Sequence, residues 1–509
     1  MEKIRAVRNL TCSAAAFRGC LARFDSVLLP RHQRWAESVK LLAVLATVLL
    51  FRTGDAVRAD DLRTRVRESV RAEIAKLPSG TTCGLLVETI DGRTIFSNDA
   101  DVPLKPASVM KLFTTGAALH RLGPDFTYET RFYLHGNDLL VVGSGDPGLG
   151  DPRFAAMRNE QVESVFDRLA VALRSAAVTR IDKIAIDDSR FDQQYRHEDW
   201  PDDQADRWYQ APVGAVNFND NCITPTVDIS NGRPIIIATP KLPLHFFKND
   251  LRVAEKGGPR VDRAIDSDTI RFSGTLHKRT GMRDVAVRDP SLTFGFALQA
   301  ALSDRGIETG NDIVRRTLPT EVLRAQRLIH SERNGIRDII GRCNTHSQNL
   351  FAECLMKSLA AYDKHEQDTA NIGSWGRARD VLANTIEALG VDLRGASFRD
   401  GSGLSHENRV TAQQIVRLLQ VMRRSAHWSI FRDSLANAGE NGTLKNRYNH
   451  PALVGRLFGK TGTISGVRAL AGYIERDDKP ALVFALMVNG EPPVGFREKI
   501  AQILAVESD

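Results

Sequence analysis

The stretch "LFGKTGTISGVRALAGYIERDDKPALVFALMVNG", residues 457–490, reads as one strand followed by two further strands around a charged turn. Its runs are rich in apolar and β-branched residues, as is typical of strands. Strands joined by short turns pair antiparallel. The stretch therefore predicts an antiparallel sheet, with Lys460-Thr461-Gly462-Thr463 on the first of its strands.

A hairpin is predicted by "CGLLVETIDGRTIFSND", residues 83–99, where Asp91-Gly92 separates two strand-like runs. Asp-Gly between apolar runs is a strong signal for a tight turn. Ahead of the hairpin, apolar residues recur at every fourth position and form one stripe on a helix, which we expect to pack against a sheet. The stripe consists of Leu62, Val66, Val70 and Ile74.

"PASVMKLFTT", residues 106–115, predicts the start of a helix that ends before Gly123. Pro106 suits the position just ahead of such a helix. Ser108 lies at the helix start, where unpaired N–H groups and the helix dipole favour developing negative charge. Lys111 lies three residues later on the same face, so its amine can reach the Ser108 hydroxyl.

The Ser108–Lys111 pair has two interpretations: a nucleophile beside its base, or a polar turn, since Ser-x-x-Lys also occurs by chance in long chains. A lysine acts as a base only when burial or a second cation lowers its pKa. Lys460 is the candidate for that second cation. Between these elements, Ser347 and Asn349 form Ser-x-Asn at the head of an apolar helix, a weak signal alone.

Taken together and in this order, the three elements resemble the signature of penicillin-binding proteins and serine β-lactamases. Three further segments are similar to the class C low-molecular-mass penicillin-binding proteins, the D-alanyl-D-alanine carboxypeptidase and endopeptidase family. The similarity extends over nearly the whole chain after the leader. The segments are "GSGDPGL" (143–149), "DGSGLSHENRVTA" (400–412) and "GENGTLKNRY" (439–448).

The resemblance implies an α/β (α+β) fold: a serine β-lactamase-like catalytic domain of an antiparallel sheet with helices, interrupted by a large β-rich insertion. The spacing agrees, because Ser108 and Ser347 are much further apart than a compact β-lactamase requires. We expect one inserted domain nested in another. The predicted divisions are a leader over 1–59, a first catalytic segment over 60–126, the insertion over 127–288 and a second catalytic segment over 289–509.

The resemblance also implies catalytic roles for the motif residues. Ser108 Oγ attacks the carbonyl of the penultimate D-alanine of a peptidoglycan stem peptide, and Lys111 takes the proton. Ser347 passes a proton to the leaving amine. Asn349 holds Lys111 and the substrate amide. Water then hydrolyses the acyl-enzyme, so the reaction needs no metal and no organic cofactor.

Substrate binding is implied for the strand that carries Lys460. This lysine, with the hydroxyls of Thr461 and Thr463, binds the terminal carboxylate, and Gly462 completes the motif. The N–H groups of Ser108 and Thr463 form the oxyanion hole. Penicillins present a similar carboxylate beside a strained amide, so we expect β-lactam antibiotics to acylate and inhibit the protein.

The expected function is that of a serine-type D-alanyl-D-alanine carboxypeptidase, with additional endopeptidase activity left open. A serine β-lactamase is an alternative, disfavoured by the large insertion and by the absence of an evident deacylating glutamate. A non-enzymatic cell-wall binding protein is another, disfavoured because every catalytic motif residue is present. The sequence departs from the family near Ser347, with Thr345, His346 and Gln348, and we expect His346 to be a surface residue at the helix start.

The sequence pI of about 9.1 and net charge of +7 arise mainly in the leader. Residues 1–59 contain ten Lys or Arg against four Asp or Glu, and the remaining 450 residues contain 59 against 58. The chain after the leader is therefore almost neutral, which argues against nucleic acid as a partner.

An apolar run from Leu41 to Phe51 follows the basic region of the leader. As a helix it would span about 16 Å, which suits a signal peptide and not a membrane anchor. Val57 and Ala59 predict cleavage before Asp60, so we expect export to the periplasm or cell envelope. A buried N-terminal helix and a later start codon remain alternatives, and peripheral membrane association of the mature chain is left open.

Four cysteines follow the leader, without the spacing of a zinc site. We expect free buried thiols or at most one disulfide. The four are Cys83, Cys222, Cys343 and Cys354.

Overall fold

The computed structural model describes residues 64–363, 371–477 and 479–506. A compact unit begins at Val66 and contains all of the predicted site residues. The predicted leader, 1–59, lies outside the described residues, so its cleavage remains a prediction. Within the described ranges, none of the helices combines the length and apolar character needed to cross a membrane.

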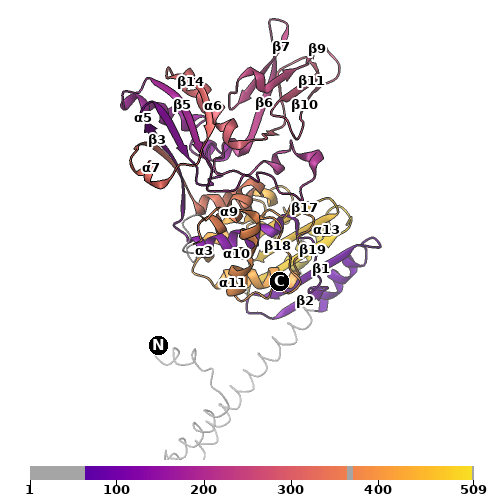
Figure 1. Ribbon diagram of the computed structural model, residues 1–509. Coiled ribbons are helices and arrows are strands. Elements are labelled where there is room, and N and C mark those ends of the chain that lie inside the picture. Colours follow the sequence, from indigo (N-terminus) through magenta and orange to yellow (C-terminus); the bar gives the residue numbers. More distant parts are fainter. Residues whose placement is uncertain (1–63, 364–370, 478, 507–509) are drawn as a thin grey trace, which may run out of the picture. The chain divides into compact units, whose positions relative to one another are not determined.

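A six-stranded sheet in which all neighbours pair antiparallel forms the first layer of the fold (Figure 1). Both predicted strand groups belong to it, and Gly92 N donates to Thr89 O at 2.8 Å in the predicted hairpin turn. In order across the sheet, the strands are β16 (Ala436–Asn437), β17 (Leu457–Ile464), β18 (Val467–Ile474), β19 (Leu482–Asn489), β1 (Thr82–Thr89) and β2 (Thr94–Asn98).

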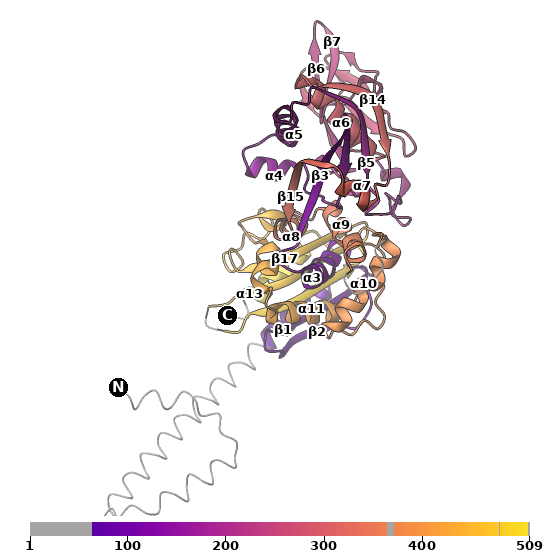
Figure 2. The same cartoon turned by 60° about the vertical axis from the view of Figure 1, so that its left-hand side comes forward.

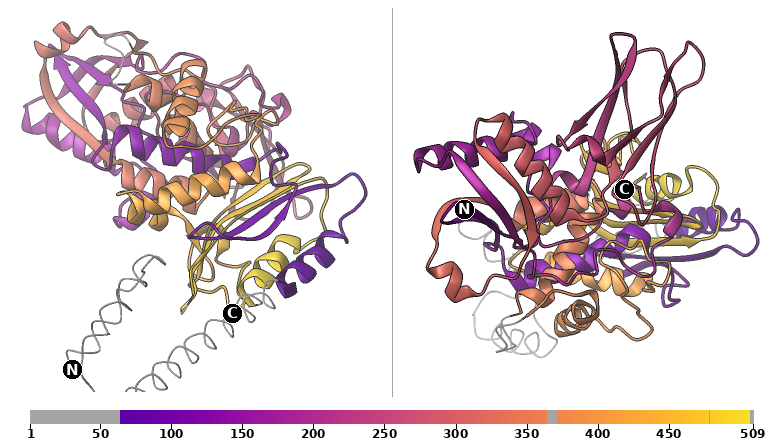
Figure 3. Two further views of the ribbon diagram at one scale, coloured as in Figure 1. Left: turned by 90° about the horizontal axis from the view of Figure 1, so that it is seen from below. Right: turned by 45° about the horizontal axis from the view of Figure 1, so that its top comes forward.

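Helices cover both faces of this sheet (Figure 2). On one face, α11 (Ala412–Arg424) packs against β1 and β19, and α3 (Lys111–Leu122) lies beside it. On the other face lie α13 (Phe496–Val506) and the helix that ends at residue 74, side by side in the left view of Figure 3. Burial on both faces explains why β19 is a continuous apolar run.

The predicted apolar stripe ahead of the hairpin is confirmed where the structure describes it. Val66 and Val70 are buried in the core beneath α13, and Ile74 packs against the same core. Leu62, the first member of the stripe, lies outside the described residues. The stripe therefore closes the second face of the six-stranded sheet.

A second, five-stranded sheet belongs to the β-rich inserted region. Its strands β14, β5 and β4 are parallel, and β4, β3 and β15 are antiparallel. Two smaller sheets contain β6 (Cys222–Ser230) and β11 (Ile270–Leu276). The five strands, in order, are β14 (Glu308–Arg315), β5 (Arg180–Asp187), β4 (Asp138–Val142), β3 (Thr127–His135) and β15 (Arg327–Gly335).

One expectation about the insertion is wrong. The second catalytic segment is predicted to begin at Asp289 with the helix α6 (Pro290–Asp304), but this helix packs on β14 and β5 and shares their core through residues such as Phe294. Strands β14 and β15 also pair within the five-stranded sheet. The chain returns to the core that contains α3 and α11 at α8 (Ile336–Thr345). The remaining domain limits stay predictions.

Candidate active site

Ser108 lies in a short 3₁₀ turn, Ala107–Met110, that leads directly into α3. Two glycines approach this turn closely. A Cβ on Gly403 would lie 1.9 Å from Ala107 O, and one on Gly462 would lie 2.7 Å from Pro106 O. Because any larger residue would displace the turn, both positions require glycine, and they fix the backbone that presents the half-buried Ser108 hydroxyl.

Lys111 is the first residue of α3 and is fully buried. Its Nζ donates to Ser108 Oγ at 3.1 Å, to Asn349 Oδ1 at 2.7 Å and to Ser402 O at 2.8 Å. The Ser108–Lys111 pair is therefore not a surface turn. The amine lies within hydrogen-bond distance of the hydroxyl whose proton it would accept.

Ser347 and Asn349 stand at the start of α9 (Asn349–Ala361), a helix whose residues are all buried, as the sequence predicted. Ser347 has a φ of 60°, in the left-handed region that is uncommon for serine. Lys460 Nζ donates to Ser347 Oγ at 2.8 Å, and Asn349 Nδ2 donates to Tyr209 O at 2.8 Å. Hydrogen bonds thus join Ser108, Lys111 and Asn349 in one group and Ser347 with Lys460 in another.

The pKa values of both lysines are lowered, and burial is the first cause for each. The pKa of Lys111 falls to about 8, although Cys343, Glu353 and Asp400 oppose the shift. The pKa of Lys460 lies well below its usual value because of burial and then repulsion from Lys111. Both amines therefore lose their protons at lower pH than a lysine in water. Burial is the first cause of the Lys111 shift, as expected, and the expected contribution of Lys460 to it stays a prediction.

Glu353 is a site residue that sequence reasoning missed. It lies one turn after Asn349 on α9. Its carboxylate accepts hydrogen bonds from Ser402 N at 2.7 Å and from Gly401 N at 2.9 Å. Ser402 O in turn accepts the hydrogen bond from Lys111. Burial, and then the charge of Asp400, raise the pKa of Glu353 to about 7. An acidic residue within a largely apolar helix was the available signal.

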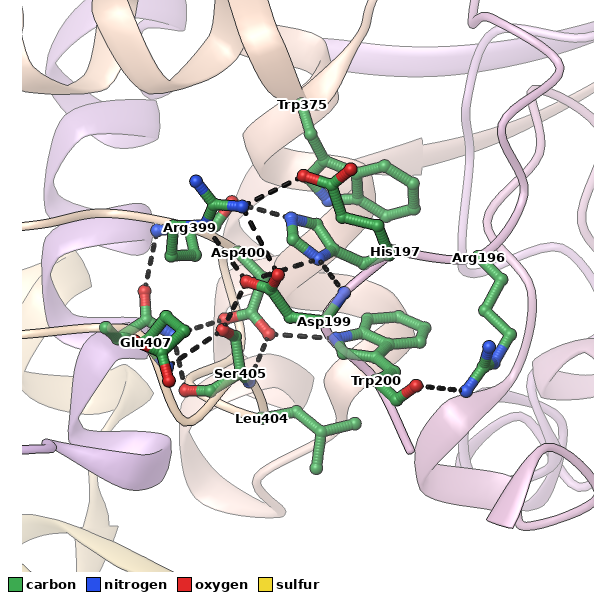
Figure 4. Close-up of polar contacts among 12 residues, drawn as sticks. Arg196, His197, Asp199, Trp200, Trp375, Arg399, Asp400, Leu404, Ser405 and Glu407 are labelled. Atoms are coloured by element: carbon green, nitrogen blue, oxygen red, sulfur yellow. Dashed lines mark hydrogen bonds and ion pairs between the residues drawn. The ribbon is translucent and has the colours of Figure 1, made fainter. Parts of the chain in front are cut away.

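Asp400 is the first residue of the loop 400–405, which contains Ser402, and its side chain holds this loop (Figure 4). Its carboxylate accepts Gly403 N at 2.8 Å and Ser405 N at 2.7 Å. It also accepts Trp200 Nε1 at 2.9 Å, and Trp200 comes from the inserted region. The "DGSGLS" segment is therefore a turn. It connects Trp200 of the inserted region to the Ser402 carbonyl that contacts Lys111.

The edge of β17 is open beside these residues. Among the described strands, β16 pairs with β17 only at Phe458 and Gly459, so no strand covers the edge from Lys460 onward. Thr461 Oγ1 donates to Thr443 Oγ1 at 3.1 Å, and Thr463 is exposed. An open strand edge can pair with an extended peptide.

Arg497 on α13 is a second residue that the sequence did not reveal. Its Nη1 donates to Gly462 O at 2.8 Å, to Thr463 Oγ1 at 3.3 Å and to Ala469 O at 3.0 Å. The guanidinium is buried behind the sheet. It fixes the strand that carries Lys460, and its place on a helix near the chain end gave no local signal.

His346 differs from its prediction as a surface residue. It is half-buried and lines a cavity beside Ser347. Burial, with Arg153 and Arg342 nearby, lowers its pKa to about 4, so the imidazole is neutral at physiological pH. All four described cysteines are free and buried, as expected.

Comparison with known proteins gives consistent matches. A model of the D-Ala-D-Ala carboxypeptidase 3 (S13) family matches residues 66–508. The chain is 30% identical to a D-alanyl-D-alanine carboxypeptidase of Actinomadura sp. (strain R39), over 93% of this chain and 90% of that protein. It is 22% identical to the D-alanyl-D-alanine carboxypeptidase DacB of Haemophilus influenzae, over 82% of this chain and 87% of the relative.

Solved structures agree in fold. The crystal structure of penicillin binding protein 4 (dacB) from Haemophilus influenzae matches with a TM-score of 0.71 and 21% identity, over 86% of this chain and 98% of that chain. The same protein complexed with a novel beta-lactam matches with a TM-score of 0.67. The predicted fold, an antiparallel sheet with helices and a β-rich insertion, is confirmed.

Proposed function

Since the chain belongs to the D-Ala-D-Ala carboxypeptidase 3 (S13) family and is thus a D-alanyl-D-alanine carboxypeptidase, we propose that it cleaves peptidoglycan stem peptides through an acyl-enzyme on Ser108. The observation that carries this assignment is the buried Lys111 amine at 3.1 Å from Ser108 Oγ. A buried amine with a lowered pKa beside a half-exposed hydroxyl is the arrangement that general-base activation of serine requires.

Acylation forms the bond from Ser108 Oγ to the carbonyl carbon of the penultimate D-alanine and breaks the bond to the terminal amine. The neutral form of Lys111 accepts the hydroxyl proton. With a pKa of about 8, roughly one molecule in ten holds Lys111 neutral at pH 7. Ser347, which already accepts a hydrogen bond from Lys460, passes a proton to the departing D-alanine amine. Water then hydrolyses the acyl-enzyme and frees Ser108.

The substrate strand pairs with the open edge of β17 in this proposal. The terminal carboxylate binds Lys460 and the hydroxyls of Thr461 and Thr463, because a cation with hydroxyl donors gives both charge and orientation. A bound carboxylate stabilises the charged form of Lys460. That charge then repels the Lys111 ammonium and lowers its pKa, so the substrate itself favours the base.

The N–H groups of Ser108 and Thr463 are proposed to form the oxyanion hole. Ser108 lies where the 3₁₀ turn meets α3, a place where unpaired donors and the helix dipole favour negative charge. Donors held in place before the reaction stabilise the oxyanion without reorganising. The glycine contacts at 403 and 462 keep this backbone fixed.

β-Lactams are proposed to acylate Ser108 in the same geometry. Residues 1–59 are proposed to direct export, so that the mature chain works in the periplasm or cell envelope, where stem peptides are found.

Product analysis tests the function. We expect a stem pentapeptide incubated with the protein to lose one D-alanine, as read by mass spectrometry, and nitrocefin to be turned over only slowly. Rapid nitrocefin turnover without D-alanine release would indicate the β-lactamase alternative. The absence of both reactions would indicate a non-enzymatic binding protein.

A further inference from the structure

A cavity of about 330 Å³ opens beside Ser347. His346 and Gln348, the two neighbours of Ser347, line it together with Thr443, whose hydroxyl accepts from Thr461 Oγ1. Its volume lies at the lower end of the range for small-ligand sites. Thr443 thus connects the cavity to Thr461, whose hydroxyl the proposed function assigns to the terminal carboxylate.

Two arginines give this cavity a cationic wall. Arg342 lies deep, where it donates to Asp151 at 3.0 Å and to Asp220 at 3.1 Å. Arg153, on the short helix α4 (Pro152–Met157), is exposed, and no described residue forms a hydrogen bond or ion pair with its guanidinium. Arg153 is therefore the cation available to a ligand.

Two carboxylates, Asp220 and Asp284, also line the cavity, and among the described residues neither forms a hydrogen bond or ion pair with Arg153. Asp220 accepts from Gln348 and Arg342, and burial followed by Asp151 raises its pKa well above the usual value, which favours its neutral form. Asp284, on the wall from the insertion, accepts from Thr224 at 2.7 Å.

The two guanidinium groups act on each other across the cavity. Partial burial and then repulsion from Arg342 lower the pKa of the exposed Arg153, although Asp151 and Asp220 oppose the shift. His346 Nδ1 is buried with no hydrogen-bond partner among the described residues. An anion that bound Arg153 would relieve this repulsion and form a charge-assisted hydrogen bond.

Resting on the proposed function, we propose that this cavity binds a second carboxylate carried by the leaving group, with Arg153 as its specificity-determining residue. D-Alanine has only the carboxylate that Lys460 binds. A leaving residue with a further carboxylate would contact Arg153 as well. The cavity therefore favours leaving groups larger and more acidic than D-alanine.

A matched pair of peptides tests this proposal. Both end in D-alanine followed by one residue with a free carboxyl group, either D-glutamate or its isostere D-glutamine. We expect the parent to have a kcat/KM about tenfold higher for the D-glutamate peptide, the value of one charge-assisted contact. Arg153→Gln should reduce this ratio to about one, and Arg153→Lys should retain some of it because the charge remains.

Arg233→Gln is the control, because Arg233 is an exposed arginine at the start of β7 (Arg233–Thr239) and does not line the cavity. It should keep the parent ratio. A parent that does not distinguish the two peptides, or a full preference in Arg153→Gln, would overturn the inference. Acylation by penicillin is measured in each variant, so failure of the proposed function itself is seen as a parent that penicillin does not label.

Discussion

Lys111 has to be buried to act as a base, and at the residue scale this burial makes the reaction depend on pH. Its pKa of about 8 lies below the usual 10.5, so the active, neutral form is lost as pH falls through 8. We expect the rate of penicillin acylation to fall about tenfold for each pH unit below about 7. Stopped-flow measurement across pH 5–9 checks this, and a rate that does not change with pH would contradict Lys111 as the base.

The lowered pKa of Lys111 also makes the stability of the folded protein depend on pH. The folded pKa of Lys111 lies below the unfolded value, so the unfolded chain binds more protons between about pH 8 and 10.5. Its burial therefore costs stability below pH 8, and this cost disappears as the pH rises toward 10.5.

Lys460 is predicted to act on both binding and acylation once substrate is present. Lys460→Ala should lower acylation efficiency for a free-acid peptide ten- to hundredfold, since a charge-assisted contact contributes roughly 1.5–3 kcal/mol. In the parent, the acid limb of the kcat profile should lie at lower pH for the free acid than for the C-terminal amide, because the bound carboxylate keeps Lys460 charged.

The control for this experiment is Lys460→Arg, which keeps the charge and should retain more activity than Lys460→Ala. Equal losses on the acid and amide peptides, together with acid limbs that coincide in the parent, would show that Lys460 has no such double role.

The motif residues were predictable from sequence because each forms its contact from a short, recognisable segment. Glu353 and Asp400 were not, because both hold the backbone of the 400–405 loop, whose Ser402 carbonyl contacts Lys111. The Glu353–Ser402 contact joins residues 49 positions apart and depends on how α9 packs against a loop. No local pattern encodes such a contact.

At the scale of elements, the turn that carries Ser108 is held between the 400–405 loop and β17. Gly403 and Gly390 have similar φ values, +82° and +85°, but only Gly403 has atoms in contact at its Cβ position. Both alanine variants should lose about 1 kcal/mol from backbone strain. Gly403→Ala should in addition slow penicillin acylation at least tenfold, because Ala107 must move.

Thermal unfolding and acylation rates measured together separate the two effects. If Gly390→Ala and Gly403→Ala slowed acylation equally, the loop would not be positioning Ser108. The sequence indicated a tight turn at "DGSGLS", but its contact with Ala107 arises only from tertiary packing.

For the whole molecule, the six-stranded sheet was predictable because its hairpins are local in sequence. The end of the insertion was not. The periodicity of residues 290–304 predicts a helix, but not the sheet on which it packs, and β14 and β15 pair with strands over 100 residues earlier in the chain. The two catalytic segments, before and after the insertion, come together only in the folded structure, where α8 and α9 contact α3.

Export is a prediction for the whole chain that depends on its leader. We expect the mature protein outside the cytoplasm to begin near Asp60, because the short apolar run and Ala59 suit signal-peptide cleavage. N-terminal sequencing of the exported protein checks this. An exported protein with residues 1–40 intact would be the contrary result.

The central claim is that Ser108 forms the acyl-enzyme, and mapping of the penicillin adduct tests it most directly. The parent should gain one penicillin per chain, on the peptide that contains Ser108. Ser108→Ala should gain none while its thermal unfolding is unchanged, since only one half-buried hydroxyl is removed. An adduct on another residue, or stoichiometric labelling that persists in Ser108→Ala, would contradict the account.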